Sequence, residues 1–305
     1  MQLREFLKLN NHSGAVDFEV LEDVTLENFR RQLIRYQSPD GDWIPAYLFI
    51  PTANGPHAAV LIHHQHNAER HFGKSEVAGL AGNPLQAFGP SLAALGYVVL
   101  APDSICFEDR RPNRKGTERD TEENNWLQHF NEMTYRLVKG DSLMRKVLDD
   151  ASIGISLLSN LSSVSKNCIG VLGHSYGGNT ALFQAATDDR IRFVGSSGAL
   201  CSYQQKLEVG TGLEMALVVP GITSHFDFDR ILSEIAPRNV LIVSADQDKY
   251  SKDADLICKS VESKFKQSDG SSSLSHFRDS GGHALTEQRH QVIVDWMKRL
   301  YENKR

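Results

Sequence analysis

The chain has 305 residues and a formal net charge of −5, with 33 basic and 38 acidic side chains. This balance provides no basic surface field for nucleic acid, and no apolar run approaches the roughly 20 residues that cross a bilayer. No basic segment followed by an apolar run opens the sequence, so no secretory signal is expected. Four widely spaced cysteines without a C-x-x-C pattern favour a reduced, cytoplasmic location. We therefore expect a globular protein that binds neither nucleic acid nor membranes.

The first part of the chain predicts an appendage followed by a hairpin. Residues 1–28 combine a short amphipathic pattern with acidic loops, and we expect this segment to pack on the body or on a second copy in a homodimer. Residues 29–51 contain two strand-like runs separated by a turn at Asp40-Gly41, which is a strong hairpin pattern.

From residue 58 onward, apolar runs typical of buried strands alternate with helical patterns. Strands are expected at 58–63, 97–102, 168–172, 191–196 and 239–244, and helices at 84–95, 253–265 and 286–301. This alternation predicts an α/β protein with a mostly parallel, twisted sheet and helices on both faces, formed as one domain over residues 29–305.

The longest departure from this alternation covers residues from about 103 to 141. A charged loop is followed by apolar side chains at helical spacing, namely Trp126, Phe130, Met133 and Leu137. This stripe is interpreted either as packing against the body or as a small partial lid whose aromatic residues line a pocket. A second irregular stretch, 201–230, should rise at the same sheet edge.

The strand expected at 168–172 ends in Gly173-His174-Ser175-Tyr176-Gly177, and a helix-compatible stretch follows at once. This is the G-x-S-x-G nucleophile elbow in its strand–turn–helix context. Glycine is needed on both sides of Ser175 because a Cβ there would collide with neighbouring backbone. An ordinary glycine-rich turn with a capping serine is the simpler interpretation of the same string.

A serine hydroxyl is a weak nucleophile unless a base and an orienting acid accompany it. Asp248 follows the strand expected at 239–244, and His283 lies in a glycine-rich loop directly before the last helix. The order Ser, Asp, His and the strand-end positions predict a triad of Ser175, Asp248 and His283. Asp246 is the alternative acid, although it suits an Asx turn within the loop.

Acyl transfer also needs two N–H donors for the developing oxyanion. The amide of Tyr176, at the start of the new helix, is the first candidate. The second is expected after the strand at 58–63, from the amide of His66 or, second in preference, of Gln65. A metal site is the competing interpretation of this loop, since imidazole is a common zinc ligand and the loop contains His63, His64, His66 and His71.

These pieces together resemble bacterial α/β-hydrolases of the dienelactone hydrolase-related and acetyl xylan esterase-like group. The resemblance spans about residues 30–300, on the elbow, the order of the triad and flanking segments such as 43–51, 96–103, 235–238 and 281–283. It implies an α/β-hydrolase fold and a serine hydrolase that cleaves a carboxylic ester or lactone through an acyl-enzyme, without a cofactor.

The serine at position 175 departs from the cysteine nucleophile of true dienelactone hydrolases, which argues against dienelactone as the substrate. The same triad would also serve thioester, amide or C–C bond hydrolysis, or acyl transfer. A peptidase resembling the prolyl oligopeptidase group is a second alternative, but a 305-residue chain lacks room for the propeller found there. A non-catalytic binding or assembly protein that kept the fold is a third.

Overall fold

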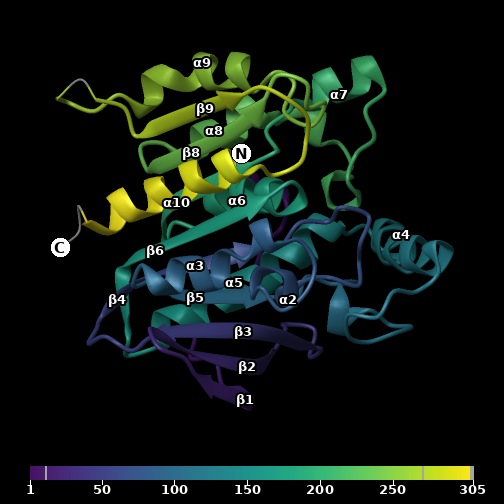
Figure 1. The fold of residues 1–305 in the computed structure, drawn as a ribbon. Coiled ribbons are helices and arrows are strands. Elements are labelled where there is room, and N and C mark those ends of the chain that lie inside the picture. The colour runs from purple at the N-terminus through teal and green to yellow at the C-terminus, as the bar shows by residue number, and fades with distance from the viewer. Residues whose placement is uncertain (11, 270, 303–305) are drawn as a thin grey trace.

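The computed structural model describes residues 1–10, 12–269 and 271–302 as one sheet covered by helices on both faces (Figure 1). The nine strands of this part of the chain are β1 Phe18–Thr25, β2 Phe29–Gln37, β3 Trp43–Pro51, β4 His57–His63, β5 Val98–Pro102, β6 Val164–His174, β7 Ile191–Ser197, β8 Asn239–Ala245 and β9 Leu274–Asp279. Their order across the sheet is β1-β2-β3-β5-β4-β6-β7-β8-β9. Neighbouring strands pair in parallel along the series β5-β4-β6-β7-β8-β9. At the other end of the sheet, β1, β2 and β3 pair antiparallel with one another in turn, and β3 is also antiparallel to β5.

Helices connect these strands. The α-helices are α1 Leu3–Phe6, α2 Lys74–Val77, α3 Phe88–Ala94, α4 Glu122–Val138, α5 Leu143–Asn160, α6 Tyr176–Thr187, α7 Tyr203–Val209, α8 Phe228–Ile235, α9 Ala254–Phe265 and α10 Glu287–Glu302. Short 3₁₀ turns lie at η1 Pro84–Gln86, η2 Glu108–Arg110, η3 Met215–Leu217 and η4 Ile222–Ser224. The predicted α/β class and mostly parallel sheet are confirmed.

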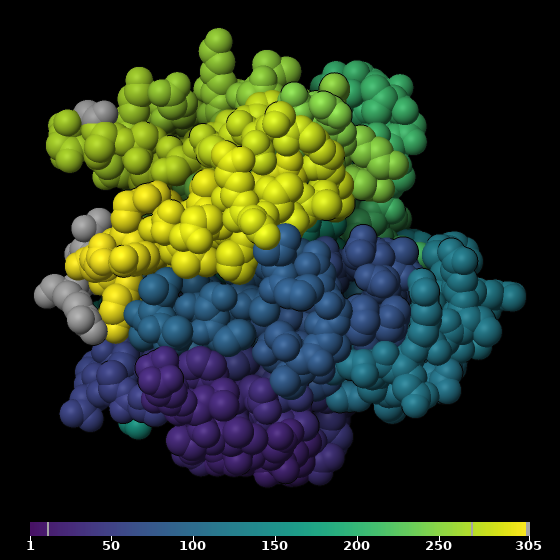
Figure 2. All heavy atoms as spheres, in the orientation of Figure 1, coloured from purple at the N-terminus to yellow at the C-terminus, as the bar shows by residue number. Residues whose placement is uncertain are grey.

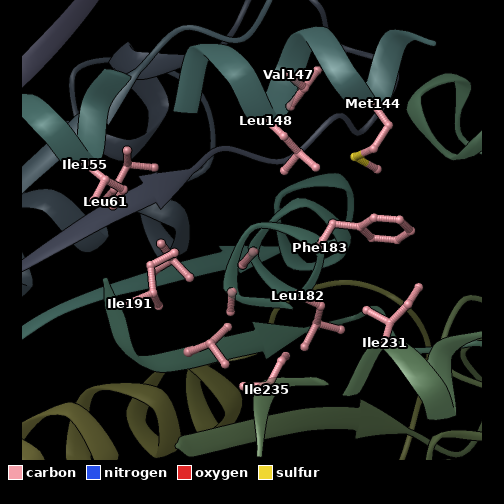
Figure 3. Packing of buried hydrophobic residues seen from close by; sticks show 14 of the residues in the cluster. Leu61, Met144, Val147, Leu148, Ile155, Leu182, Phe183, Ile191, Ile231 and Ile235 are labelled. Carbon is pink, nitrogen blue, oxygen red and sulfur yellow. The ribbon is translucent and has the colours of Figure 1, made fainter. Parts of the chain in front are cut away.

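The continuous apolar runs of the central strands arise because both faces of the sheet are covered. Successive side chains of a strand point to opposite faces, so Leu61 of β4 packs in one core cluster while Val60 and Ile62 pack in the other. Figure 3 shows Leu61 in the first cluster, where side chains of α5, α6 and α8 meet. The second cluster includes Phe88 of α3 and Trp296 of α10, and these helices cover the face seen in the space-filling view (Figure 2).

The N-terminal segment is part of the body. Leu3 of α1 is fully buried in the first core cluster, and its N–H donates to the Glu234 carboxylate of α8. Of the two expected packing modes, the structure therefore shows packing on the body.

Residues 18–25, expected as acidic loop, instead form the edge strand β1. Their acidic side chains suit this place because β2 presents arginines opposite them, with pairs such as Arg35–Glu19 at 2.6 Å and Arg31–Glu22 at 3.7 Å. The sequence pattern lacked apolar alternation because this exposed strand buries little surface.

The hairpin predicted at 29–51 is formed by β2 and β3, in an unbroken antiparallel register. The helix expected at 84–95 is split into η1 and α3. The irregular stretch at 201–230 contains α7 and two 3₁₀ turns, which the sequence pattern had not indicated. None of the described helices is long and apolar enough to span a membrane.

Candidate active site

Ser175 lies in the sharp turn between β6 and α6, where the carboxyl ends of the parallel strands meet. Its φ is +57°, a strained conformation that costs about 1–3 kcal/mol for a residue other than glycine. The Ser175 N–H donates to the Ser197 carbonyl at the end of β7 over 2.7 Å, and this bond helps to hold the turn. A Cβ on Gly173 would come within 2.2 Å of the Gly177 backbone, so the two glycines approach each other as the elbow pattern predicts.

A chain of hydrogen bonds joins the three residues predicted as a triad. The Ser175 hydroxyl lies 2.7 Å from Nε2 of His283, and Nδ1 of His283 lies 3.1 Å from Oδ1 of Asp248. A carboxylate only accepts hydrogen bonds, so Nδ1 carries the imidazole proton and Nε2 is left to accept from Ser175. This tautomer is the one that a general base needs.

The buried carboxylate of Asp248 is held in its ionised form by its neighbours. Burial is the largest single effect and raises the pKa of Asp248, but the hydrogen bond and electrostatic attraction of His283, the Tyr250 N–H and the Ser251 hydroxyl together outweigh it. The net effect lowers the pKa of Asp248 below its usual value. Asp246, the alternative acid, instead accepts the Gly281 N–H over 2.8 Å and shapes the loop that carries His283.

Two rings enclose the imidazole of His283. The Tyr250 ring packs edge-on against it at 4.8 Å between centroids, and the His174 ring lies 5.3 Å away. Burial and the nearby His283 lower the pKa of His174 to about 3, so His174 remains neutral beneath the site. Its Nδ1 is 3.0 Å from the Ser197 hydroxyl, which fixes the ring.

The three residues predicted for the oxyanion site lie in different settings. Tyr176 is the first residue of α6, where backbone N–H groups have no partner inside the helix. His66 lines the same pocket as Ser175. Gln65 precedes His66 in the same loop, but it is buried and its side chain donates to the Glu76 carboxylate, and it is not among the residues that line the pocket.

His64 fixes the backbone at this place, a role that sequence reasoning missed. The Ser104 N–H donates to Nε2 of His64 over 3.1 Å, so the proton of the neutral ring is on Nδ1, which donates to the Gln65 carbonyl over 2.8 Å. Because the peptide is planar, fixing the Gln65 carbonyl also fixes the direction of the His66 N–H. Burial lowers the pKa of His64 to about 4, which keeps the ring neutral.

A pocket of about 430 Å³ opens above Ser175. Its lining comes from the elbow and the first turn of α6, the loops after β4 and β7, the helix α4, the segment that leads into η3, and the loops that carry the acid and the base. It consists of His66, Asn67, Ala68, Arg70, Trp126, Ser175, Tyr176, Asn179, Gly198, Gly212, Leu213, Glu214, Met215, Tyr250 and His283.

Within the lid-like insertion, Trp126 alone of the four stripe residues lines this pocket. Met133 is buried in the first core cluster, and Phe130 and Leu137 pack against it. Most of the stripe therefore packs against the body and anchors α4, whereas Trp126 faces the pocket.

The histidines of the β4 loop do not gather around a metal position in the described part of the chain. Nε2 of His63 pairs with the Gln184 side chain, His64 is bonded as above, and the His71 ring lies tilted against the Phe72 ring at 4.1 Å between centroids. Only His66 belongs to a group with metal-ligand spacing, together with His129 and Glu214. The separate acidic group of Asp103, Glu108 and Asp109 surrounds the ammonium of Lys74, which supplies the positive charge there.

Comparisons with known proteins assign the chain to a family. The family model of the dienelactone hydrolase family matches residues 44–301. The chain belongs to this family. It is an α/β-hydrolase.

Relatives support the same assignment. YtaP of Bacillus subtilis (strain 168), which carries a hydrolase name, is 29% identical over 259 residues that cover 82% of this chain and 81% of YtaP. Among solved structures, a Bacteroides fragilis NCTC 9343 protein described as an acetyl xylan esterase has a TM-score of 0.74 at 16% identity, covering 98% of this chain and 85% of its own. A glucuronoyl esterase from Solibacter usitatus has a TM-score of 0.69 at 16% identity, covering 98% and 92%. At these identities the structural likeness concerns the fold.

Proposed function

We propose that this α/β-hydrolase cleaves carboxylic esters or lactones with Ser175 as nucleophile, His283 as general base and Asp248 as the orienting acid. The observation that carries the proposal is the chain of hydrogen bonds from Ser175 through His283 to Asp248. The Ser175 end of this chain lines a pocket that is large enough for a small acyl substrate. The esterase names of the structural neighbours favour the same class of reaction.

The reaction proceeds in two halves. As the Ser175 hydroxyl attacks the ester carbonyl, its proton passes to Nε2 of His283, and Asp248 stabilises the imidazolium that forms. His283 then protonates the leaving alcohol, and an acyl-enzyme remains on Ser175. Water, deprotonated by His283, attacks the acyl group and releases the acid.

Two backbone donors stabilise the oxyanion in this scheme. The amide of Tyr176 lies at the N-terminus of α6, and the amide of His66 is oriented through the bond of His64 to the Gln65 carbonyl. Each such donor contributes about 3 kcal/mol to lowering the barrier. We prefer His66 to Gln65 because His66 lines the pocket. No step requires a cofactor.

The test is the pair of variants Ser175→Ala and Ser162→Ala, the second being a matched control because Ser162 is exposed. Purified protein is assayed with p-nitrophenyl acetate and labelled with a fluorophosphonate probe. We expect Ser175→Ala to lose both hydrolysis and labelling, while Ser162→Ala retains both. Full activity in Ser175→Ala would refute the assignment, and a wild-type protein that neither hydrolyses nor labels would be a binding protein.

The same triad can act on thioesters, amides or C–C bonds, or transfer the acyl group to another acceptor. A panel of acyl esters, lactones and thioesters, with Ser175→Ala as background, separates these reactions. We expect the largest kcat/KM on esters or lactones.

The four cysteines are free and buried, and we propose a cytoplasmic location from their reduced state.

A further inference from the structure

A large aromatic side chain on the pocket wall is left half uncovered. Trp126, in the first half of α4, is 47% exposed and lines the pocket that contains Ser175. Tryptophan side chains are highly buried on average, because the indole ring exposes a large apolar surface when it meets water. An indole that faces a pocket and stays exposed offers this surface to whatever enters the pocket.

Part of the indole is covered from within the same helix. The ring of Phe130, one turn further along α4, stacks on Trp126 with the two planes 16° apart and the centroids 4.6 Å apart. Phe130 itself packs against the first core cluster. The stack therefore holds Trp126 against the body, and the pocket meets the part of the indole that Phe130 leaves uncovered.

The helix is also fixed on both sides of Trp126. The side-chain oxygen of Asn125 accepts from the buried guanidinium of Arg111 over 3.2 Å. The side chain of Gln128 donates to the Cys106 carbonyl over 2.9 Å. Since these anchors order the wall before any ligand arrives, binding against Trp126 costs little additional conformational entropy.

The apolar lining continues on a neighbouring segment. The turn η3 packs against α4, and the segment that leads into it contributes Leu213 and Met215 to the pocket lining. Both side chains also pack against the first core cluster. A methionine thioether makes favourable contacts with aromatic rings. Two packed elements, α4 and the segment at η3, thus present an indole, a thioether and a leucine to the pocket.

The character of the whole lining favours an aromatic ring over an alkyl chain. A flat ring gains stacking attraction from the indole beyond the burial of its area, which an alkyl chain does not. The lining also includes polar side chains such as Arg70 and Asn179. An alkyl chain cannot interact with these groups, whereas the face of an aromatic ring attracts both guanidinium and N–H groups.

We propose that Trp126 forms the wall of a subsite that binds an aromatic ring of the substrate. The preferred substrates are then esters that carry an aryl group on the acyl or the alcohol side. This inference rests on the proposed function, since the subsite belongs to the pocket that contains Ser175. The pocket volume of about 430 Å³ lies within the range of roughly 300–1,000 Å³ that small-molecule sites occupy.

Two pairs of esters test the proposal, each with an aromatic and a saturated ring of the same size. Benzyl acetate is compared with cyclohexylmethyl acetate, and methyl phenylacetate with methyl cyclohexylacetate. In all four a methylene group separates the ring from the ester, and each kcat/KM is divided by the hydroxide rate constant of the same ester. We expect the aromatic ester to be preferred about fivefold in one pair, which tells on which side of the ester the ring belongs. Equal rates within both pairs, or a preference for the saturated rings, would overturn the subsite.

Three variants assign the preference to the indole. We expect Trp126→Leu, which keeps an apolar side chain, to abolish the preference for the aromatic ester, and Trp126→Phe to restore part of it. The control Leu127→Ala changes a partly exposed neighbour that is not among the lining residues, and it should keep the full preference. An equal loss on the aromatic and the saturated ester in Trp126→Leu would show that Trp126 has only a structural role.

A binding measurement without turnover separates this proposal from the proposed function. The chain has three tryptophans, so ¹⁵N spectra of Ser175→Ala should show three indole N–H resonances, and adding Trp126→Phe identifies the one from Trp126. We expect this resonance to shift on titration with the preferred aromatic ester, at lower concentrations than with its saturated counterpart. A shift without hydrolysis of any ester by the wild type would refute the proposed function and support the subsite. Equal hydrolysis of all four esters without a shift would refute the subsite alone.

Discussion

A single methyl group added at Gly177 tests how closely the elbow must approach the loop after β4. A Cβ at this position would lie 2.2 Å from the His63 carbonyl oxygen and 2.8 Å from that of His64. An ordinary contact begins at 3.4 Å, so α6 and the end of β4 must separate by about 1.2 Å in Gly177→Ala.

This displacement separates the two sides of the proposed oxyanion site, since Tyr176 is on α6 and His66 follows β4. A misplacement of about 1 Å costs about a hundredfold in rate, so we expect kcat/KM on p-nitrophenyl acetate to fall by about that factor in Gly177→Ala. Alanine gains up to about 1 kcal/mol of helix propensity over glycine, but overpacking costs about 1–3 kcal/mol. A modest net loss of stability is therefore expected.

The assay measures kcat/KM at a temperature where thermal melting shows that the variant is folded. Gly14→Ala is the matched control, because a Cβ at Gly14 meets nothing within 4 Å. If Gly177→Ala is folded and retains activity within about threefold of the wild type, the close approach does not position the catalytic groups and the reasoning is refuted.

The remaining predictions concern the acid and the buried lysine. Asp248→Asn should lose about 10⁴-fold in kcat because it no longer holds the tautomer of His283; near-normal kcat would exclude Asp248 as the acid. The lowered pKa of Asp248 means that its ionised form stabilises the fold above about pH 4, and that this stabilisation is lost as pH falls through the folded-state pKa. The unfolding free energies of wild type and Asp248→Asn, from urea titrations, should therefore converge toward acidic pH, and divergence would contradict this assignment. Lys74→Met removes the ammonium group that three carboxylates surround. We expect it to lower the unfolding free energy measured by urea titration by about 3–5 kcal/mol, whereas Lys139→Met, at an exposed position, should leave that free energy unchanged.

Local patterns were sufficient for the central sheet and for the positions of the candidate triad. The elbow around Ser175 combines an apolar strand, two glycines and a helix within a dozen residues, so a short stretch of chain carries the whole pattern. Asp248 and His283 follow strands whose carboxyl ends must share one edge in a parallel sheet, and the structure brings both to Ser175.

The same reasoning failed where long-range partners decide. Residues 18–25 have no apolar alternation, and they form β1 because β2 supplies backbone partners and arginines. In the sequence, His64 is one of several histidines in a short loop, and nothing distinguishes it from the others. Its hydrogen bonds to Ser104 and Gln65 orient a peptide plane, and they depend on where β5 ends beside β4.

The sequence by itself therefore determined the fold class and the order of the proposed triad, because strand and helix periodicity and a tight glycine turn are short-range properties. Only the tertiary structure decided which groups face the pocket. His66, His129 and Glu214 lie in three separate segments, and only packing brings two ring nitrogens and a carboxylate oxygen of these residues within 4.8 Å of one another.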